Sequence, residues 1–396
     1  MNKTPNSNRF QIGIFGKTNS GKSSLLNKIV GQDISIVSNV SGTTTDSVKK
    51  AMEFLPFGPV LFIDTAGLDD KSELGKIRVK KALNELKKVD FALFVMDSKN
   101  IDMAFYRDQI IKFKQYNIPY ILVLSKSELL SNDEKNTIEK IFPTGIFVTV
   151  EDEKSILNLK DRMLLEFSKE KEESKLIGDL LPYNSKVIMV VPVDSEAPKG
   201  RLILPQVQIL RECLDSGIKS YVVRDTELSS ALDDITNVDL VITDSQAFKE
   251  VEKIVDGRAK LTSFSILFAR QKGDLDTMVK GVKTLSKLNH GDKILIAETC
   301  THNTSHEDIG RVKIPKLIKK YTGKEVEFDF KFGNDFPEDL KNYALVIHCG
   351  ACMLNKKNMQ IRIDESLESN VPITNYGLVI AEVNGILNSA IKIFNL

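Results

Sequence analysis

Two hydrophobic periods alternate along the first part of the chain. Short apolar runs are typical of buried strands, and they lie at Ile12–Phe15, Val60–Ile63, Phe91–Met96, Tyr120–Leu124 and Ile146–Val150. Segments with the helical period separate them, at Ser23–Val30, Ile77–Lys88 and Asp108–Tyr116. Strands that alternate with helices predict βαβ units and a mainly parallel sheet.

The same alternation continues beyond the charged run Ser168–Lys175, where we expect the first domain, residues 1–172, to end. A second α/β domain is predicted over 180–260, with strands Val187–Val193, Tyr221–Val223 and Leu240–Thr243 and helices Pro205–Asp215 and Ser245–Val255. A third is predicted over 262–396, with strands Ser263–Phe268, Lys293–Ala297 and Ala344–Ile347 and helices Asp274–Leu288, Pro315–Tyr321 and Ala381–Ile393. The predicted fold class is α/β in three domains.

Composition narrows the class of protein. The chain has 396 residues, and 55 Lys and Arg against 54 Asp and Glu give a formal net charge of +1. This balance provides no overall basic field for a nucleic acid. The polar N-terminus and the lack of an apolar run of 18 residues favour a cytoplasmic protein without a membrane span. For the four cysteines, metal binding or catalysis is then favoured over a disulfide framework.

A phosphate-binding loop is predicted between the first strand and the first helix. Gly16–Ser23 fits the pattern G-x-x-x-x-G-K-[ST] in the strand–loop–helix context that this pattern needs. Backbone N–H groups of such a loop surround phosphates, Lys22 reaches the β- and γ-phosphates, and the Ser23 hydroxyl ligates magnesium. The expected nucleotide-binding residues of this segment are Thr18, Asn19, Ser20, Gly21, Lys22, Ser23 and Ser24.

Three further segments fit a nucleotide site. Asp64 ends a buried strand, where it can bind magnesium through water, and Gly67 can offer its N–H to a γ-phosphate. The polar loop Gly42–Asp46 lies between the two motifs. After the strand Tyr120–Leu124, Ser125, Lys126 and Glu128 stand where a carboxylate can accept the N1 and N2 protons of guanine.

The first 170 residues resemble the tRNA-modification GTPases, a group with G-x-x-N-x-G-K-S, G-T-T-x-D and D-T-A-G-L motifs. The resemblance implies that Thr44 binds magnesium and that Asn19 helps to hold a potassium ion. Leu68 stands where Ras-like enzymes have a water-orienting glutamine, which favours an activating cation. Ser125 replaces the usual asparagine of the guanine motif, so we expect loss of the amide that contacts the base and braces the loop. The last base-binding motif, expected near Val148–Val150, is not recognisable.

Cysteine and histidine gather after two predicted strands of the third domain. Cys300 and His302 follow one, and His348, Cys349 and Cys352 follow the other, at the strand ends where α/β sheets place their sites. Buried cysteines, structural zinc, a redox pair and a three-cysteine iron–sulfur cluster are the alternatives, and the spacing alone does not separate zinc from iron–sulfur. Cys213 is expected in the core, on the apolar face of a helix, and His290 in a turn.

The combination of a GTPase domain, a small middle domain and this cysteine pattern resembles the FeFe-hydrogenase maturation GTPases. Gly200–Gln208 and Phe264–Arg270 also look like segments of that family. The resemblance implies GTP or GDP, Mg²⁺ and a 4Fe–4S cluster on Cys300, Cys349 and Cys352. It also implies a diiron precursor as cargo, radical-SAM maturases and apo-hydrogenase as partners, and a middle domain that forms a homodimer or a higher oligomer.

Two points stay open in the sequence. The fourth cluster ligand has as candidates His302, His348, Glu298, Glu307 and solvent, and a labile ligand there would leave a docking position for the precursor. The function has two rivals: an RNA-modification or assembly GTPase with a structural zinc site, and an iron–sulfur electron carrier with a nucleotide switch.

Overall fold

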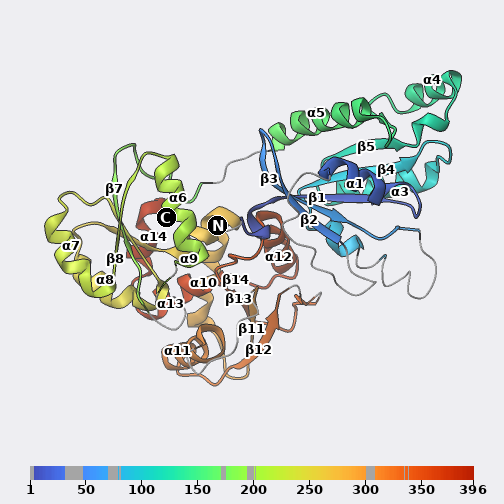
Figure 1. Ribbon diagram of the computed structural model, residues 1–396. Helices are drawn as coiled ribbons and strands as arrows, with labels where there is room; N and C mark the ends of the chain where they lie inside the picture. The colour runs from blue at the N-terminus through green and yellow to red at the C-terminus, as the bar shows by residue number, and fades with distance from the viewer. Residues whose placement is uncertain are drawn as a thin grey trace. The chain divides into compact units, whose positions relative to one another are not determined.

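The computed structural model describes residues 4–31, 48–69, 79, 82–170, 175–193, 200, 202–299, 308–333, 335–337 and 339–396. The chain divides into two compact units, Met1–Glu172 and Glu173–Leu396. Figure 1 shows both, and each is described by itself.

The first unit is built on one six-stranded sheet in the order β2-β3-β1-β4-β5-β6. Its strands are β1 Phe10–Gly16, β2 Val48–Phe54, β3 Gly58–Asp64, β4 Phe91–Asp97, β5 Tyr120–Ser125 and β6 Ile146–Val148. All neighbours pair in parallel except β2, which runs antiparallel to β3. The five strands predicted from apolar runs are therefore confirmed, and β2, whose residues are more polar, was not predicted.

Helices pack on this sheet, so both of its faces are buried. The full helices described here are α1 Lys22–Val30, α3 Met103–Gln115, α4 Asn132–Ile141 and α5 Glu153–Glu170. One apolar cluster joins β-strand residues to α1 and α5, and a second joins them to α3 and α4. Parallel strands with both faces covered are nearly continuous in apolar residues, which explains why their runs could be detected in the sequence.

The second unit contains two four-stranded sheets in which every pairing is parallel. The first has the order β10-β9-β7-β8 and the second β12-β11-β13-β14. The strands are β7 Lys186–Val190, β8 Lys219–Val223, β9 Leu240–Thr243, β10 Lys260–Ser263, β11 Lys293–Glu298, β12 Glu327–Phe332, β13 Leu345–His348 and β14 Ile373–Asn375.

Residues from both sheets of the second unit share one apolar core. The helices around it are α6 Leu204–Asp215, α7 Leu228–Asp234, α8 Phe248–Val255, α9 Phe264–Lys272, α10 Leu275–Val282, α11 Ile314–Thr322, α12 Lys356–Glu368, α13 Tyr376–Val383 and α14 Leu387–Ile391. The α/β fold class is thus confirmed. No helix in the ranges that the structure describes is long and apolar enough to cross a membrane.

Two predicted elements of the second unit are wrong. Ser263–Phe268 is the start of α9 and not a strand, because Ser263 ends β10 and its hydroxyl accepts the N–H of Ile266 as a helix cap. The helix predicted over Ala381–Ile393 is two helices, α13 and α14, since Gly385 between them has φ +74°.

Candidate nucleotide site and cysteine loop

The loop Gly16–Ser23 connects β1 to α1, as the sequence predicts. The turn needs two left-handed residues, Asn19 with φ +61° and Gly21 with φ +90°. Ser20 is buried and closes the turn by donating its N–H to the Lys17 carbonyl at 3.3 Å. Asn19 and Ser24 are exposed, so the loop presents its asparagine to the solvent side.

The Lys22 side chain folds back into this loop and is only 7% exposed. Its Nζ donates to the Lys17 carbonyl at 2.7 Å and to the Gly16 carbonyl at 3.3 Å. Burial lowers the pKa of the ammonium, and the charges of Asp64 and Asp69 oppose that shift. The cation is therefore held at the loop, in the position where phosphates bind in this type of loop.

The side chains of Ser23 and Asp64 are hydrogen-bonded to each other near Lys22. The Ser23 hydroxyl donates to Asp64 Oδ2 at 2.6 Å, while Asp64 Oδ1 is buried and has no hydrogen-bond partner. Burial raises the pKa of this carboxyl, and the hydrogen bond from Ser23 and the charges of Lys22 and Lys50 lower it. A buried, unpartnered carboxylate oxygen next to a hydroxyl fits a hard cation such as Mg²⁺.

The segment after Asp64 lies directly against the phosphate loop. A Cβ on Gly67 would be 2.3 Å from Thr18 Oγ1, so only glycine permits this approach. Two residues on, Asp69 Oδ1 accepts the Thr18 backbone N–H at 2.7 Å and its hydroxyl at 2.9 Å. Burial raises the pKa of Asp69, but the bonds from Thr18 bring it below the ordinary value. The sequence analysis missed Asp69, and Thr44 lies outside the described residues.

Ser125 braces the phosphate loop, contrary to the expectation from its replacement of asparagine. Its buried hydroxyl lies 2.7 Å from the Ser20 carbonyl and 3.0 Å from the Met96 carbonyl. A hydroxyl thus keeps the brace that we expected to be lost with the amide. The segment just after β6 lies close to the turn after Ser125, because Thr149 Oγ1 is 2.8 Å from Ser127 Oγ.

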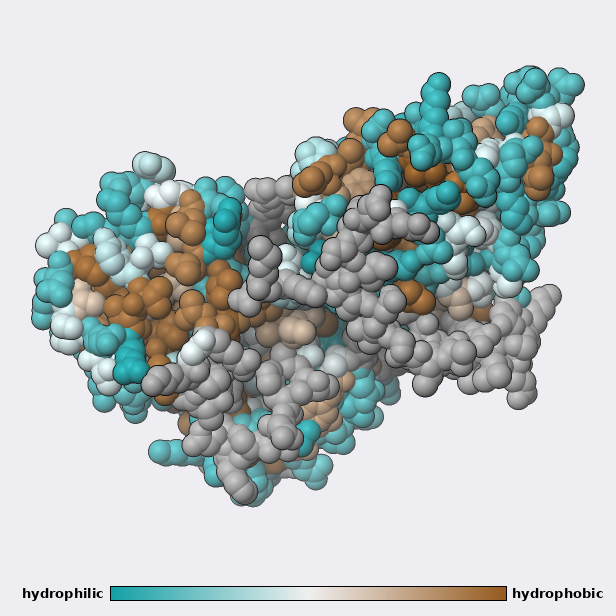
Figure 2. Space-filling model, in the orientation of Figure 1, coloured by the Kyte–Doolittle hydropathy of each residue, from teal (hydrophilic) through white to brown (hydrophobic). Residues whose placement is uncertain are grey.

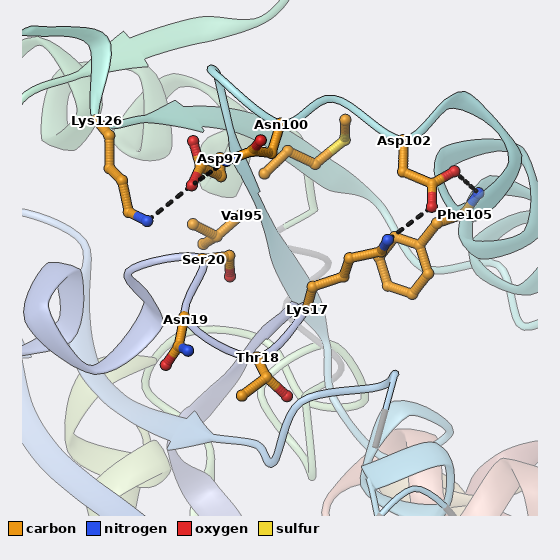
Figure 3. A pocket seen from close by; sticks show the side chains of 11 residues that line it. Lys17, Thr18, Asn19, Ser20, Val95, Asp97, Asn100, Asp102, Phe105 and Lys126 are labelled. Carbon is orange, nitrogen blue, oxygen red and sulfur yellow. Dashed lines mark hydrogen bonds and ion pairs between the residues drawn. The ribbon is translucent and has the colours of Figure 1, made fainter. Parts of the chain in front are cut away.

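A cavity of about 270 Å³ lies between the phosphate loop and the segment that follows β4 (Figure 3). Two ion pairs stand on its walls: Lys126 Nζ is 2.7 Å from Asp97, and Lys17 Nζ is 2.6 Å from Asp102. Thr18, Asn19 and Ser20 complete the side formed by the loop. Glu128 is exposed and does not line this cavity.

In the second unit, two of the predicted thiols lie in the loop after β13. Cys349 follows β13 and receives the Thr299 N–H on its sulfur at 3.3 Å, while Thr299 Oγ1 is 3.2 Å from the same atom. Thr299 itself follows β11, the neighbouring strand. Burial raises the pKa of the Cys349 thiol, and the hydrogen bonds from Thr299 and Ala351 oppose this. The predicted strand ends therefore do meet at this sulfur.

His348 makes contacts other than the expected ones. Its Nε2 is 2.7 Å from Arg362 Nη1, and its Nδ1 is 2.9 Å from the Cys349 carbonyl. Because a guanidinium only donates, Nε2 is the acceptor and Nδ1 carries the proton. Burial, followed by the charge of Arg362, lowers the pKa of His348 to about 3. Both ring nitrogens are engaged in these contacts, and through them His348 links Arg362 to the cysteine loop.

Lys272, the last residue of α9, holds the other end of this loop. Lys272 is buried, with 5% of its surface exposed. Its Nζ donates to the carbonyls of Ala351 at 3.1 Å, Cys352 at 3.1 Å and Leu354 at 2.8 Å. The sequence analysis missed both Lys272 and Arg362, since each lies far along the chain from the cysteines.

The remaining predicted residues have simpler outcomes. Cys213 is fully buried in an apolar cluster and His290 lies in a turn, so both predictions are confirmed. Cys300, His302 and Glu307 lie outside the described residues. Within the described part of the chain, no group of three or more His, Cys, Asp or Glu side chains could hold a metal ion.

A family model and several known GTPases match part of this chain. Residues 11–126 match the family described as 50S ribosome-binding GTPase. The chain is 39% identical over 131 residues to the tRNA modification GTPase MnmE of Pelagibacter ubique (33% of this chain, 28% of that protein). It is 34% identical over 133 residues to the GTPase Era of Caldicellulosiruptor saccharolyticus (33% of this chain, 44% of that protein). The chain thus spans less than half of the length of each of these relatives. The fold, the loop and these matches define the first unit as a P-loop GTPase domain.

The second unit shows which GTPase family is involved. Residues 176–273 match the hydrogen maturase F dimerization domain, and residues 276–393 match the hydrogen maturase F tetramerization domain. Together these two matches cover more than half of the chain. The chain belongs to the hydrogen maturase F family.

Among solved structures, the G domain of the T. maritima FeoB iron transporter is 21% identical. The match covers 40% of this chain and 99% of the FeoB chain, with a TM-score of 0.31. A likeness this weak carries no weight for the function.

Proposed function

We propose that the protein is a GTP-hydrolysing scaffold for maturation of FeFe-hydrogenase. In this role it binds a 4Fe–4S cluster and passes a diiron precursor, its cargo, to the apo-hydrogenase. The observation that carries the proposal is the cysteine loop: Cys349 and Cys352 lie at a strand end, within a hydrogen maturase F domain, on the same chain as a GTPase domain.

The GTPase part of the proposal is supported by the chemistry of the phosphate loop. Lys22 would neutralise the charge on the β- and γ-phosphates, and it is already held at the loop by two carbonyls. Ser23 and Asp64 would hold Mg²⁺, which supplies charge neutralisation on the phosphates. On this proposal Gly67 offers its N–H to the γ-phosphate, Thr44 adds a magnesium ligand, and Asn19 helps to hold K⁺.

Guanine recognition is proposed for Lys126 and Glu128, which follow β5 on the turn after Ser125. The exposed Glu128 carboxylate would accept the N1 and N2 protons of guanine. Adenine lacks these protons and would leave the carboxylate unpaired. Competition between GTP and ATP for binding tests this point. The Glu128→Gln variant should lose most of its preference for GTP over ATP.

The cluster is proposed to bind through Cys300, Cys349 and Cys352, with the fourth ligand left open. The donor set fits: the Cys349 sulfur is near Cys352 and already accepts hydrogen bonds, as thiolates of iron–sulfur sites do. Bound there, the cluster would supply a soft, replaceable metal position to the cargo. Radical-SAM maturases and apo-hydrogenase are the proposed partners, in the cytoplasm.

Assembly into a homo-oligomer is supported by the second unit. Its two domains match dimerization and tetramerization families, and β8 is an edge strand. Figure 2 shows apolar residues gathered on this unit. On α6 and β8, Leu214 is 66% exposed and Val222 is 44% exposed. An apolar surface of this kind is typical of a contact with another chain.

The decisive experiment is metal and sulfide analysis of anaerobically purified protein, with its visible and EPR spectra. Iron and acid-labile sulfide in equal amounts, bound to a chain that hydrolyses GTP, are expected. Colourless protein with stoichiometric zinc would contradict the scaffold and favour the rival, an RNA-modification or assembly GTPase. The tRNA-modification relative from Pelagibacter ubique aligns with 131 residues, 33% of this chain, so it supports a GTPase domain and does not favour that rival for the whole chain.

A further inference from the structure

The cysteine loop, Cys349–Cys352, is held by Lys272, a residue that lies outside the family match that contains the loop. Lys272 ends α9, which lies within the dimerization-domain match at 176–273, whereas the loop lies within the tetramerization-domain match at 276–393. Its amino group is buried and donates hydrogen bonds to three loop carbonyls, those of Ala351, Cys352 and Leu354. One of these belongs to a proposed ligand residue.

Ala351, between the two cysteines, shows what this contact does. It has φ +53°, a left-handed conformation that residues other than glycine rarely adopt. On one side its carbonyl accepts from Lys272, and on the other its N–H bonds to the Cys349 sulfur. An unfavoured conformation persists only where its surroundings impose it. The lysine is therefore the contact that turns the Ala351 N–H toward the thiol.

The Lys272 side chain also places a buried amino group on the backbone of the cysteine loop. Its Nζ lies 3.1 Å from the carbonyl oxygen of Cys352, in an interior where few water molecules can screen it. A cation in such a place favours the more negative state of a nearby group, because charges interact strongly in a medium of low dielectric constant. Thiolates and a reduced cluster are such states.

We propose that Lys272 is a positioning residue of the cysteine centre, which fixes the Cys349–Cys352 loop and stabilises negative charge on the group that the thiolates hold. The proposal rests on the proposed function, since it assumes that these thiols are ligands. It adds that a residue of the dimerization domain sets the affinity and the potential of that centre.

The first test uses cadmium ion on the metal-free full chain and so does not depend on iron. Cd²⁺ binding is followed by thiolate-to-metal absorption in competition with a chelator. Loss of a residue that orients metal ligands typically lowers affinity about 10- to 100-fold, and we expect that loss for Lys272→Met. Lys272→Arg should restore most of the affinity, and Lys280→Met, an exposed lysine on the next helix, should leave it unchanged. Equal Cd²⁺ affinity in Lys272→Met and the wild type would overturn the proposal.

The second test separates the charge from the fold. In the reconstituted iron–sulfur protein, Lys272→Met should have a lower reduction potential than the wild type, while Lys272→Arg, which keeps the charge, should stay near it. Equal potentials in the Met and Arg variants would overturn the electrostatic role. Thermal melting of each variant excludes simple unfolding, and the Arg variant keeps the test open if the Met variant does not fold. Wild-type protein that binds Cd²⁺ but no iron–sulfur cluster would contradict the proposed function and leave the cadmium result to decide on Lys272.

Discussion

The nucleotide site and the cysteine loop are built in opposite ways. Most of the nucleotide site comes from one run of residues, Gly16–Ser23, in which the lysine is held by carbonyls of its own loop. The cysteine loop has internal bonds as well, from the Ala351 N–H to the Cys349 sulfur and from the Leu354 N–H to the Ala351 carbonyl, but side chains of other elements also hold it. It is held by Thr299 after β11, by Arg362 of α12 acting through His348, and by Lys272 of α9.

The difference teaches where each site is vulnerable. A loop that satisfies its own polar groups keeps its geometry when distant parts of the chain change. A loop fixed by side chains from three other elements depends on the packing of the whole unit. Changes at the nucleotide site should therefore act on chemistry alone, and changes around the cysteines should act on both ligand geometry and loop order.

The largest effect is expected from Cys349→Ser, which removes a thiolate from the centre. We expect loss of the iron–sulfur cluster, since too few strong ligands remain. The measurement is iron and sulfide per chain after anaerobic reconstitution, repeated for Cys300→Ser and Cys352→Ser. Cys213→Ser is the matched control, because that thiol is fully buried in an apolar cluster. Equal cluster loss in the control would move the site away from the loop.

Lys22→Ala should come next, with a fall in GTP hydrolysis of about 10²–10³-fold, because it removes a fixed positive charge from the transition state. Phosphate release in the presence of GTP and magnesium measures it. A second measurement separates the nucleotide site from the cysteine loop: the iron content of Lys22→Ala should equal that of the wild type. A variant that hydrolyses GTP normally would invalidate the assignment of the loop.

Ser125→Ala tests one of the places where the phosphate loop depends on a distant residue, as it also does where Asp69 binds Thr18 and Asp64 binds Ser23. The variant leaves the buried Ser20 and Met96 carbonyls without this donor, at a cost of about 1–3 kcal/mol. Because Ser20 belongs to the phosphate loop, we expect loss of this bond to lower GTP affinity by roughly tenfold. Calorimetric titration measures that affinity. Ser168→Ala, at an exposed position of α5, is the control. Unchanged GTP affinity in Ser125→Ala would mean that the phosphate loop does not need the brace from Ser125.

The smallest effect is expected from the monovalent cation. GTP hydrolysis by the wild type should be faster in potassium than in sodium, and Asn19→Ala should abolish that difference while leaving the sodium rate similar. Asn19 is exposed on the loop in a left-handed conformation, φ +61°, which alanine adopts less readily than asparagine. GTP affinity in sodium therefore serves as the check that the loop of the variant keeps its shape. Equal wild-type rates in the two salts would remove potassium from the site.

Local signals explain which features could be predicted from the sequence. β1, β3, β4 and β5 are continuous apolar runs buried on both sides, and the Gly16–Ser23 motif needs only its own residues to be recognised. The place of Cys349 at a strand end could be predicted because an apolar run comes just before it in the sequence. In each of these cases the evidence lies within about ten residues of the feature.

The features that were missed depend on residues distant in sequence. α9 is buried on nearly every side, so Phe264–Phe268 shows no helical period and resembles a strand. Lys272 and Arg362 look like ordinary charged residues until the fold brings them to the cysteine loop. Ser125 looked like a lost contact, because a pattern records residue types and not the hydroxyl that reaches Ser20.

The all-parallel pairing of both sheets in the second unit has a consequence for how this half of the chain folds. In the first unit β2 and β3 form a hairpin, which closes over only a few residues. Among the described strands of the second unit, each pairing joins segments separated by a helix or more. Contacts that span long stretches of chain form slowly, and their apolar strands stay uncovered for longer. Synthesis at lower temperature, or with chaperones present, should therefore raise the soluble yield of residues 173–396 more than that of residues 1–172.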